Sequence, residues 1–216
     1  MPSLRDVESL RDANAAVRTL AVAEFRALWA TIEQSWSSER IRDYLSEYVP
    51  LIVAKYGEVA AGIAADMYDA MRAEVNVAGV YAAVLADPPA VEQVRTSVRA
   101  NVTSLFRQDR DFNAVLALIA ADTVDRLALG RGKETIGLNT ELDPAGPRWA
   151  LVPFGKTCDW CLKIASWGAV RWSRVEAKAG LHGNCDCTPT VVWPDDDYPA
   201  GYDPRAISQR LQATSA

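Results

Sequence analysis

The chain has 216 residues, half of them hydrophobic, so it is long enough for one domain or two unequal ones with a sizeable core. Its formal net charge of -5 provides no basic surface of the kind that attracts nucleic acids, and we expect no nucleic-acid partner. The charged N-terminus does not resemble a secretory signal, and the apolar runs are shorter than the roughly 20 residues that span a bilayer, so we expect no membrane contact.

The first predicted helix covers residues 17–36. Apolar residues recur there at helical spacing and place five side chains on one face: Phe25, Leu28, Trp29, Ile32 and Trp36. Ahead of this stretch, Ser3 and Asp6 have the spacing of a capping box in which the shorter acid replaces glutamate.

Further helices are expected up to residue 130. One covers residues 59–86, where apolar residues follow at steps of four until Pro88 and Pro89 end the helix. A third ends near Phe106. Asp111 has the position of an N-cap for a fourth helix, which Gly130 is expected to end.

Beyond Gly130 the composition changes. Residues 131–147 are rich in turn formers and predict a linker at a domain boundary. Residues 149–152 and 190–193 have the composition of strands, and residues 158–167 favour a short helix that Gly168 ends. The sequence therefore predicts a mainly α fold, with a helical domain at 1–130, the linker, and a small α+β Cys/His module at 148–194. An irregular acidic tail at 195–216 follows, with one helical turn near 207–211.

All four cysteines and the only histidine of the chain fall in one stretch, as Cys158, Cys161, His182, Cys185 and Cys187. Because the cytoplasm keeps thiols reduced, such close cysteines indicate metal ligands or redox groups rather than disulfides. A Cys-x2-Cys pair and a second close pair together offer the tetrahedral sulfur, or sulfur and nitrogen, ligands that structural zinc prefers. The sequence predicts a zinc ion that holds this module together.

Five candidate ligands compete for four positions. Either the four thiolates bind the metal with His182 outside them, or three thiolates bind it together with His182. Three other interpretations stay open: buried cysteines without a metal, a redox dithiol at Cys158 and Cys161, and a nucleophilic pair of His182 with a thiol. The surroundings of His182 match neither a serine-hydrolase pattern nor a deaminase pattern, and we predict no catalytic residue.

Spaced motifs accompany the cysteines. They are Val152-Pro153-x-Gly155-Lys156-x-Cys158-x2-Cys161, Leu162-x-x-Ala165-Ser166-x-Gly168-Ala169-Val170 and His182-Gly183-Asn184-Cys185-Asp186-Cys187, with Arg131-Gly132-Lys133-Glu134-Thr135-Ile136 upstream. Residues 149–193 resemble the C-terminal region of phage head morphogenesis proteins like the F protein of phage Mu, in the form found in phages of actinobacteria.

The resemblance implies a minor capsid protein, present in few copies per head, that binds the portal or the major capsid protein while the head of a tailed phage assembles. It implies a location in the cytoplasm of the bacterial host during assembly and afterwards in the virion, in the capsid interior or near the portal. Some relatives are labelled capsid maturation proteases, which gives an alternative function. An unrelated zinc-stabilised protein-binding module is a third possibility.

Overall fold

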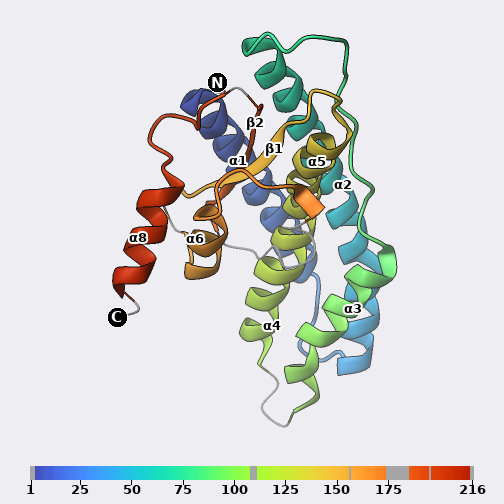
Figure 1. The fold of residues 1–216 in the computed structure, drawn as a ribbon. Helices are drawn as coiled ribbons and strands as arrows, with labels where there is room; N and C mark the ends of the chain where they lie inside the picture. The colour runs from blue at the N-terminus through green and yellow to red at the C-terminus, as the bar shows by residue number, and fades with distance from the viewer. Residues whose placement is uncertain (1–2, 108–110, 156, 174–184, 195, 215–216) are drawn as a thin grey trace.

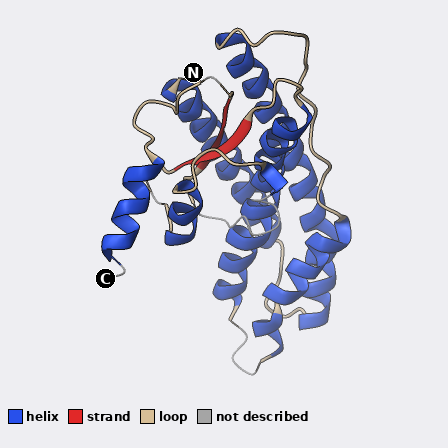
Figure 2. Cartoon of the chain, in the orientation of Figure 1, coloured by secondary structure: helices blue, strands red, loops and turns tan. Residues whose placement is uncertain are grey.

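The computed structural model describes residues 3–107, 111–155, 157–173, 185–194 and 196–214. The protein is mainly helical, and its described part contains one two-stranded sheet, close to the cysteines (Figure 1, Figure 2). This arrangement confirms the predicted fold class.

Long helices make up the first two thirds of the chain and short elements the rest. The helical part comprises α1 (Leu4–Trp29), α2 (Ser38–Glu74), α3 (Val91–Asn101), the 3₁₀ turn η1 (Thr103–Phe106), α4 (Phe112–Leu118), the π-helical segment η2 (Ile119–Asp125) and α5 (Arg126–Leu142). The C-terminal part comprises β1 (Arg148–Val152), α6 (Asp159–Ala165), β2 (Thr188–Val192) and α8 (Pro204–Thr214). Figure 1 shows α3 and α4 at one end of the bundle and the sheet towards the other.

The capping box at the start of α1 is confirmed. The backbone N–H of Asp6 donates to Ser3 Oγ at 3.2 Å, and the backbone N–H of Ser3 donates to the Asp6 carboxylate at the same distance. The predicted helix 17–36 is wrong at its C-terminal end, because α1 stops at Trp29. The Thr31 hydroxyl donates to the carbonyl of Leu28 at 2.7 Å and so satisfies a group that the ended helix leaves free.

Helix α2 begins and ends earlier than predicted. Ser37 caps its N-terminus by accepting from the N–H of Arg40, and Asn76, in the left-handed region at φ 52°, follows its last turn. Residues 77–90, predicted to continue this helix, contain no helix or strand. Their alanine and valine content suits a helix, but their backbone groups bind side chains of α2 and α5 instead.

By length and apolar character, α2 would be able to cross a membrane, yet 50% of its most apolar 18-residue window is buried inside the protein. It packs there against α1, α3 and α5. The apolar side of α2 is thus used to build the core.

The fourth helical stretch continues well beyond the predicted end. Asp111 is the N-cap, as predicted, and accepts from the N–H of Ala114 at 2.9 Å. Gly130 does not end the helix, since α4, η2 and α5 follow one another without interruption to Leu142. Residues 131–142 of the predicted linker are therefore helical, while the division of the chain into domains stays a prediction.

The glycines of α5 allow close packing. A Cβ atom at Gly132 would lie 2.8 Å from the carbonyl oxygen of Ala60 in α2, and one at Gly137 would overlap the ring of Trp172. A glycine inside a helix costs stability in isolation, but here it lets two elements approach. Gly130 has no such neighbour, because a Cβ atom there would meet nothing within 4 Å.

A buried ion pair joins α2 to the end of α5. Arg72 Nε lies 3.0 Å from Asp143 Oδ2, and both side chains are buried. The Tyr68 hydroxyl also donates to this carboxylate, at 3.1 Å. The other guanidinium nitrogens donate to three consecutive carbonyls of the non-helical segment, those of Val77, Ala78 and Gly79.

Asn139 of α5 holds the same segment further along. Its Oδ1 accepts from the N–H of Val84 at 2.9 Å and from the Tyr81 hydroxyl at 2.6 Å, and its Nδ2 donates to the Val84 carbonyl at 2.8 Å. The backbone N–H of Ala86 donates to Thr135 Oγ1. Side chains of α2 and α5 thus provide the partners that a helix or sheet would otherwise give these backbone groups.

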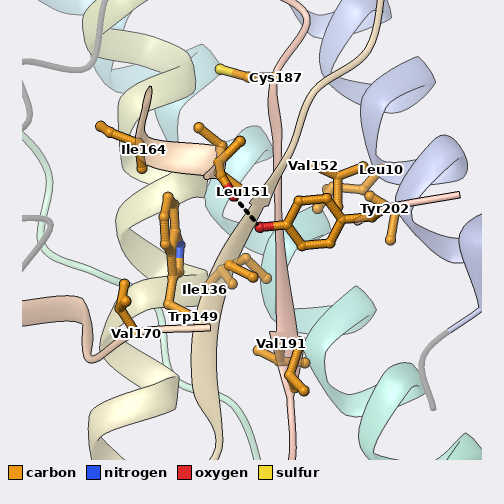
Figure 3. Close-up of a cluster of buried hydrophobic side chains, with 14 of the residues drawn as sticks. Leu10, Ile136, Trp149, Leu151, Val152, Ile164, Val170, Cys187, Val191 and Tyr202 are labelled. Atoms are coloured by element: carbon orange, nitrogen blue, oxygen red, sulfur yellow. Dashed lines mark hydrogen bonds between the residues drawn. The ribbon is translucent and has the colours of Figure 1, made fainter. Parts of the chain in front are cut away.

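The two strands pair antiparallel, with Arg148 opposite Val192 and Val152 opposite Thr188, which confirms both predicted strands. Trp149 adds a bridge to Val170 and is buried. Figure 3 shows the apolar cluster around the sheet. Its members come from both parts of the chain, with Leu10 and Ile136 of the helical part beside the side chains of the strands.

The predicted acidic tail is more ordered than expected. Helix α8 spans eleven residues rather than one turn, and its Ile207 is buried in the cluster around the sheet. The Tyr202 hydroxyl donates to the carbonyl of Ala165 at 2.7 Å, the bond drawn as a dashed line in Figure 3. The segment after the acidic run therefore belongs to the core of the C-terminal part.

Replacing Gly132 with alanine tests the close approach of α5 to α2. We expect Gly132→Ala to lower the free energy of unfolding by about 1–3 kcal/mol, because the added methyl group collides with backbone. The control Gly130→Ala should raise it by about 0.5–1 kcal/mol, since alanine favours the helix and nothing obstructs the methyl group. Urea unfolding measures both, and equal effects would contradict this packing.

The buried ion pair is tested by Arg72→Met. We expect a loss of about 3–5 kcal/mol in the free energy of unfolding, because Asp143 would remain buried without its cation. The control Arg99→Met removes an ion pair with Glu92 that is exposed on both sides, and it should change the stability little. A small effect of Arg72→Met in the same chemical denaturation experiment would show that the pair does not stabilise the fold.

Candidate metal centre

The pairing of the strands brings the two halves of the cysteine motif together. Val152, the last residue of β1, lies opposite Thr188, the first residue of β2. The loop after β1 leads to Cys158, and Cys187 directly precedes β2. Cysteines far apart in the sequence therefore meet at one end of the sheet.

The first pair is positioned by α6. Cys158 is the N-cap of this helix, and its Sγ accepts from the backbone N–H of Cys161 at 3.4 Å. Gly168, at φ 69°, follows the helix as predicted, in a conformation that favours glycine. A cap and one turn of helix thus hold both sulfur atoms on the same side of the chain.

The four sulfur atoms lie close together. Those of Cys158, Cys161 and Cys185 are within 4.8 Å of one another, and Cys161 Sγ lies 3.3 Å from Cys187 Sγ. A tetrahedral zinc ion with Zn–S bonds of about 2.3 Å needs ligand sulfurs about 3.8 Å apart. None of the four cysteines forms a disulfide, and all except Cys158 are buried. The cluster is compatible with a metal site, and the number of thiols equals the four ligands that a tetrahedral ion binds.

His182 lies outside the described residues, so the choice between four thiolates and three thiolates with His182 stays a prediction. The redox dithiol and the nucleophilic pair are likewise untested. The arrangement disfavours the interpretation in which the cysteines are simply buried without a metal. Cysteines that only fill space would lie at separate places in the core, whereas these four thiols gather at one point.

The thiols strongly perturb one another. Hydrogen bonds from Cys161, and to a smaller extent from Cys187, hold the pKa of Cys185 far below its usual range. The hydrogen bonds of Cys161 to Cys185 and Cys187 raise the pKa of Cys161. Burial adds to the rise at Cys161. A bound cation would stabilise the thiolate form of several of these cysteines together.

The helical part of the protein reaches the cluster through α1. Arg18 lies 2.8 Å from the buried carboxylate of Asp125, and it also donates to the carbonyl of Cys185 at 3.3 Å and pairs with Asp186 at 3.5 Å. Asp125 is the last residue of η2, and π-helical segments occur frequently at functional sites. This arginine therefore ties the second cysteine pair to two helices.

A second contact comes from α5. Lys133 Nζ lies 3.5 Å from Cys187 Sγ, and the lysine is only 8% exposed. Local sequence patterns do not indicate either basic residue as part of the site, because Lys133 lies in the predicted linker and Arg18 in an ordinary amphipathic pattern. The motif from Arg131 to Ile136 was the one available signal for Lys133.

Comparison with known proteins gives one informative result. A protein-family model described as VG15 protein matches residues 1–214, which cover the helical part and the cysteine cluster together. Comparisons with curated proteins and with solved structures give no match.

Metal content tests the cluster directly. We expect the purified, reduced protein to carry one divalent metal ion per chain, with thiols that react with Ellman's reagent only after a chelator removes it. Cys161→Ser and Cys187→Ser should abolish binding, because a hydroxyl is a poor substitute for a buried thiolate ligand. Elemental analysis and thiol titration provide the measurements.

His182→Ala separates the two ligand sets. With four thiolate ligands this variant keeps the metal, whereas loss of the metal as complete as in the cysteine variants would indicate three thiolates and His182. A folded protein without metal, all of whose thiols react at once, would contradict the site altogether.

Proposed function

The chain belongs to the VG15 protein family, a family of phage gene products, and we propose that it is a minor capsid protein that acts in head morphogenesis of a tailed phage. The match over residues 1–214 supports this proposal most directly, because it covers the whole arrangement of helices, sheet and cysteines. The motifs at residues 149–193, which resemble those of Mu F-like proteins, point to the same role. The protein would be present in few copies per head.

The helical part is the proposed docking surface for the portal or the major capsid protein. Leu20 of α1 is 59% exposed and Leu51 of α2 is 63% exposed, and both lie on long helices with buried opposite faces. Partner proteins bury apolar side chains of this kind at the centre of an interface. Their neighbours Ala21 and Ile52 are buried in the core of the helical part, which would present this surface as a rigid unit.

The proposed metal is zinc, held by Cys158, Cys161, Cys185 and Cys187 or by three of them with His182. When bound, zinc in a fully protein-ligated tetrahedral site stabilises a fold and leaves no position for a substrate. Such sites contribute about 10–16 kcal/mol of apparent binding free energy in small zinc modules. A structural zinc therefore suits a protein that binds other head proteins.

This role sets where the protein would act. Head assembly takes place in the cytoplasm of the bacterial host, and an assembly protein that binds the portal would afterwards lie in the capsid interior or near the portal of the virion. A capsid maturation protease is the competing function, and cleavage of the major capsid protein distinguishes it from a binding protein.

Coexpression with the portal and major capsid proteins of the same phage tests the proposal. We expect the tagged chain to retain one of them on an affinity column and to leave the major capsid protein uncleaved. Leu51→Glu should reduce the retained amount at least tenfold, because it places a charge in the proposed interface. The control Asp197→Asn alters an exposed charge in the C-terminal part, outside the proposed surface, and should bind normally.

Two results would contradict the proposal. One is failure of the folded protein to bind either partner together with its absence from purified virions. The other is cleavage of the major capsid protein that a single folded cysteine or His182 variant abolishes, which would establish the protease function.

A further inference from the structure

Lys133 is buried beside the cysteines. It lies in α5, is 8% exposed, and directs its ammonium group at Cys187 Sγ from 3.5 Å. In the part of the chain that the structure describes, no carboxylate lies within ion-pairing distance of it. Lysine is almost never fully buried unless its charge has a partner. The Cys187 sulfur is the partner that the structure offers.

The helix fixes where this ammonium group lies. Gly132, the preceding residue, packs against the backbone of α2, and Ile136, one turn later, is buried in the cluster around the sheet. α5 also packs directly on β2, which Cys187 precedes. Lys133 therefore meets the sulfur from a rigid element and not from a flexible surface chain.

A metal site filled by thiolates would carry a net negative charge that the ammonium group of Lys133 can offset. Four thiolates around one divalent ion leave a net charge of about -2 in a largely buried place, which is costly without compensation. The guanidinium of Arg18 already pairs with Asp125 and Asp186. Lys133 has no such competitor among the described carboxylates, so its positive charge is directed to the sulfur cluster.

We propose that Lys133 is an outer-sphere residue of the metal centre, whose ammonium group donates a hydrogen bond to the Cys187 thiolate and offsets its charge. This role rests on the proposed metal site. A donated hydrogen bond draws electron density from the sulfur, which makes the thiolate a poorer nucleophile and a more stable ligand in a negatively charged site. Lys133 is thus a positioning residue that sets metal affinity and protects the bound sulfur.

The experiment compares Lys133→Met with the wild-type chain. Methionine keeps most of the volume and removes both the charge and the donor. We expect the zinc dissociation constant, measured by competition with a chromophoric chelator, to rise 10- to 100-fold, as for other outer-shell partners. In the cobalt-substituted protein the sulfur-to-cobalt charge-transfer band should move to lower energy, because the sulfur becomes more electron-rich. Lys133→Arg, which keeps charge and donor, should recover part of both.

The matched control is Lys163→Met. Lys163 is exposed on α6, two residues after Cys161, and its replacement removes the same charge near the same cluster. We expect its zinc affinity and cobalt spectrum to match those of the wild type. An equal loss in both variants would indicate a general charge effect and would overturn the hydrogen bond from Lys133.

The remaining outcomes are also decisive. If the wild type binds zinc and Lys133→Met binds it with the same affinity and the same cobalt spectrum, the role of Lys133 is wrong while the metal site stands. If the wild type binds no metal, the site and this role fail together. Should Lys133→Met not fold, Lys133→Gln keeps an N–H donor without the charge, and an unchanged charge-transfer band and affinity in that variant would overturn the charge effect.

Discussion

The antiparallel pairing of β1 with β2 is the constraint on which the C-terminal part depends. Its register sets Val152 opposite Thr188, and this places the loop that leads to Cys158 beside the segment that contains Cys185 and Cys187. Two strands alone are marginal in water. Here the sheet packs on α1 and α5, and the cysteines gather at one end of it. A metal ion bound there would join the loops that the strands only bring near each other.

The helical part contributes to this centre. Arg18 reaches the carbonyl of Cys185 while it pairs with Asp125, and Lys133 reaches the sulfur of Cys187. The core around the sheet likewise includes side chains of α1, α2 and α5. A family model that covers both parts of the chain suits this arrangement, because the core around the sheet is built from side chains of both parts, although the helical part also has a core of its own at residues 17–129.

Local signals in the sequence predicted the mainly α class, both strands, the caps at Ser3 and Asp111, and the gathering of the cysteines. Local signals were misleading where tertiary contacts decide the structure. Gly130 has the features of a helix end, and only the packing of α5 on α2 explains why the helix continues past it. Residues 77–90 have helical composition, and their non-helical course depends on Arg72 and Asn139, which no local pattern reveals. The same long-range packing brings Lys133 to Cys187.

The number of residues in the π-helical segment between α4 and α5 determines how the side chains of these two helices are oriented relative to each other. Each residue of an α-helix turns the chain by about 100°, so a segment with one extra residue rotates everything after it relative to everything before it. Gly132 faces α2 and Lys133 faces the sulfur cluster, while Val115 of α4 is buried in the core of the helical part. These three directions are compatible with only one number of residues between α4 and α5. A single-codon deletion within residues 119–125 would straighten the segment into ordinary helix and turn one of the two faces away from its contacts. Variation within this stretch is therefore compatible with the fold through substitution and not through gain or loss of residues.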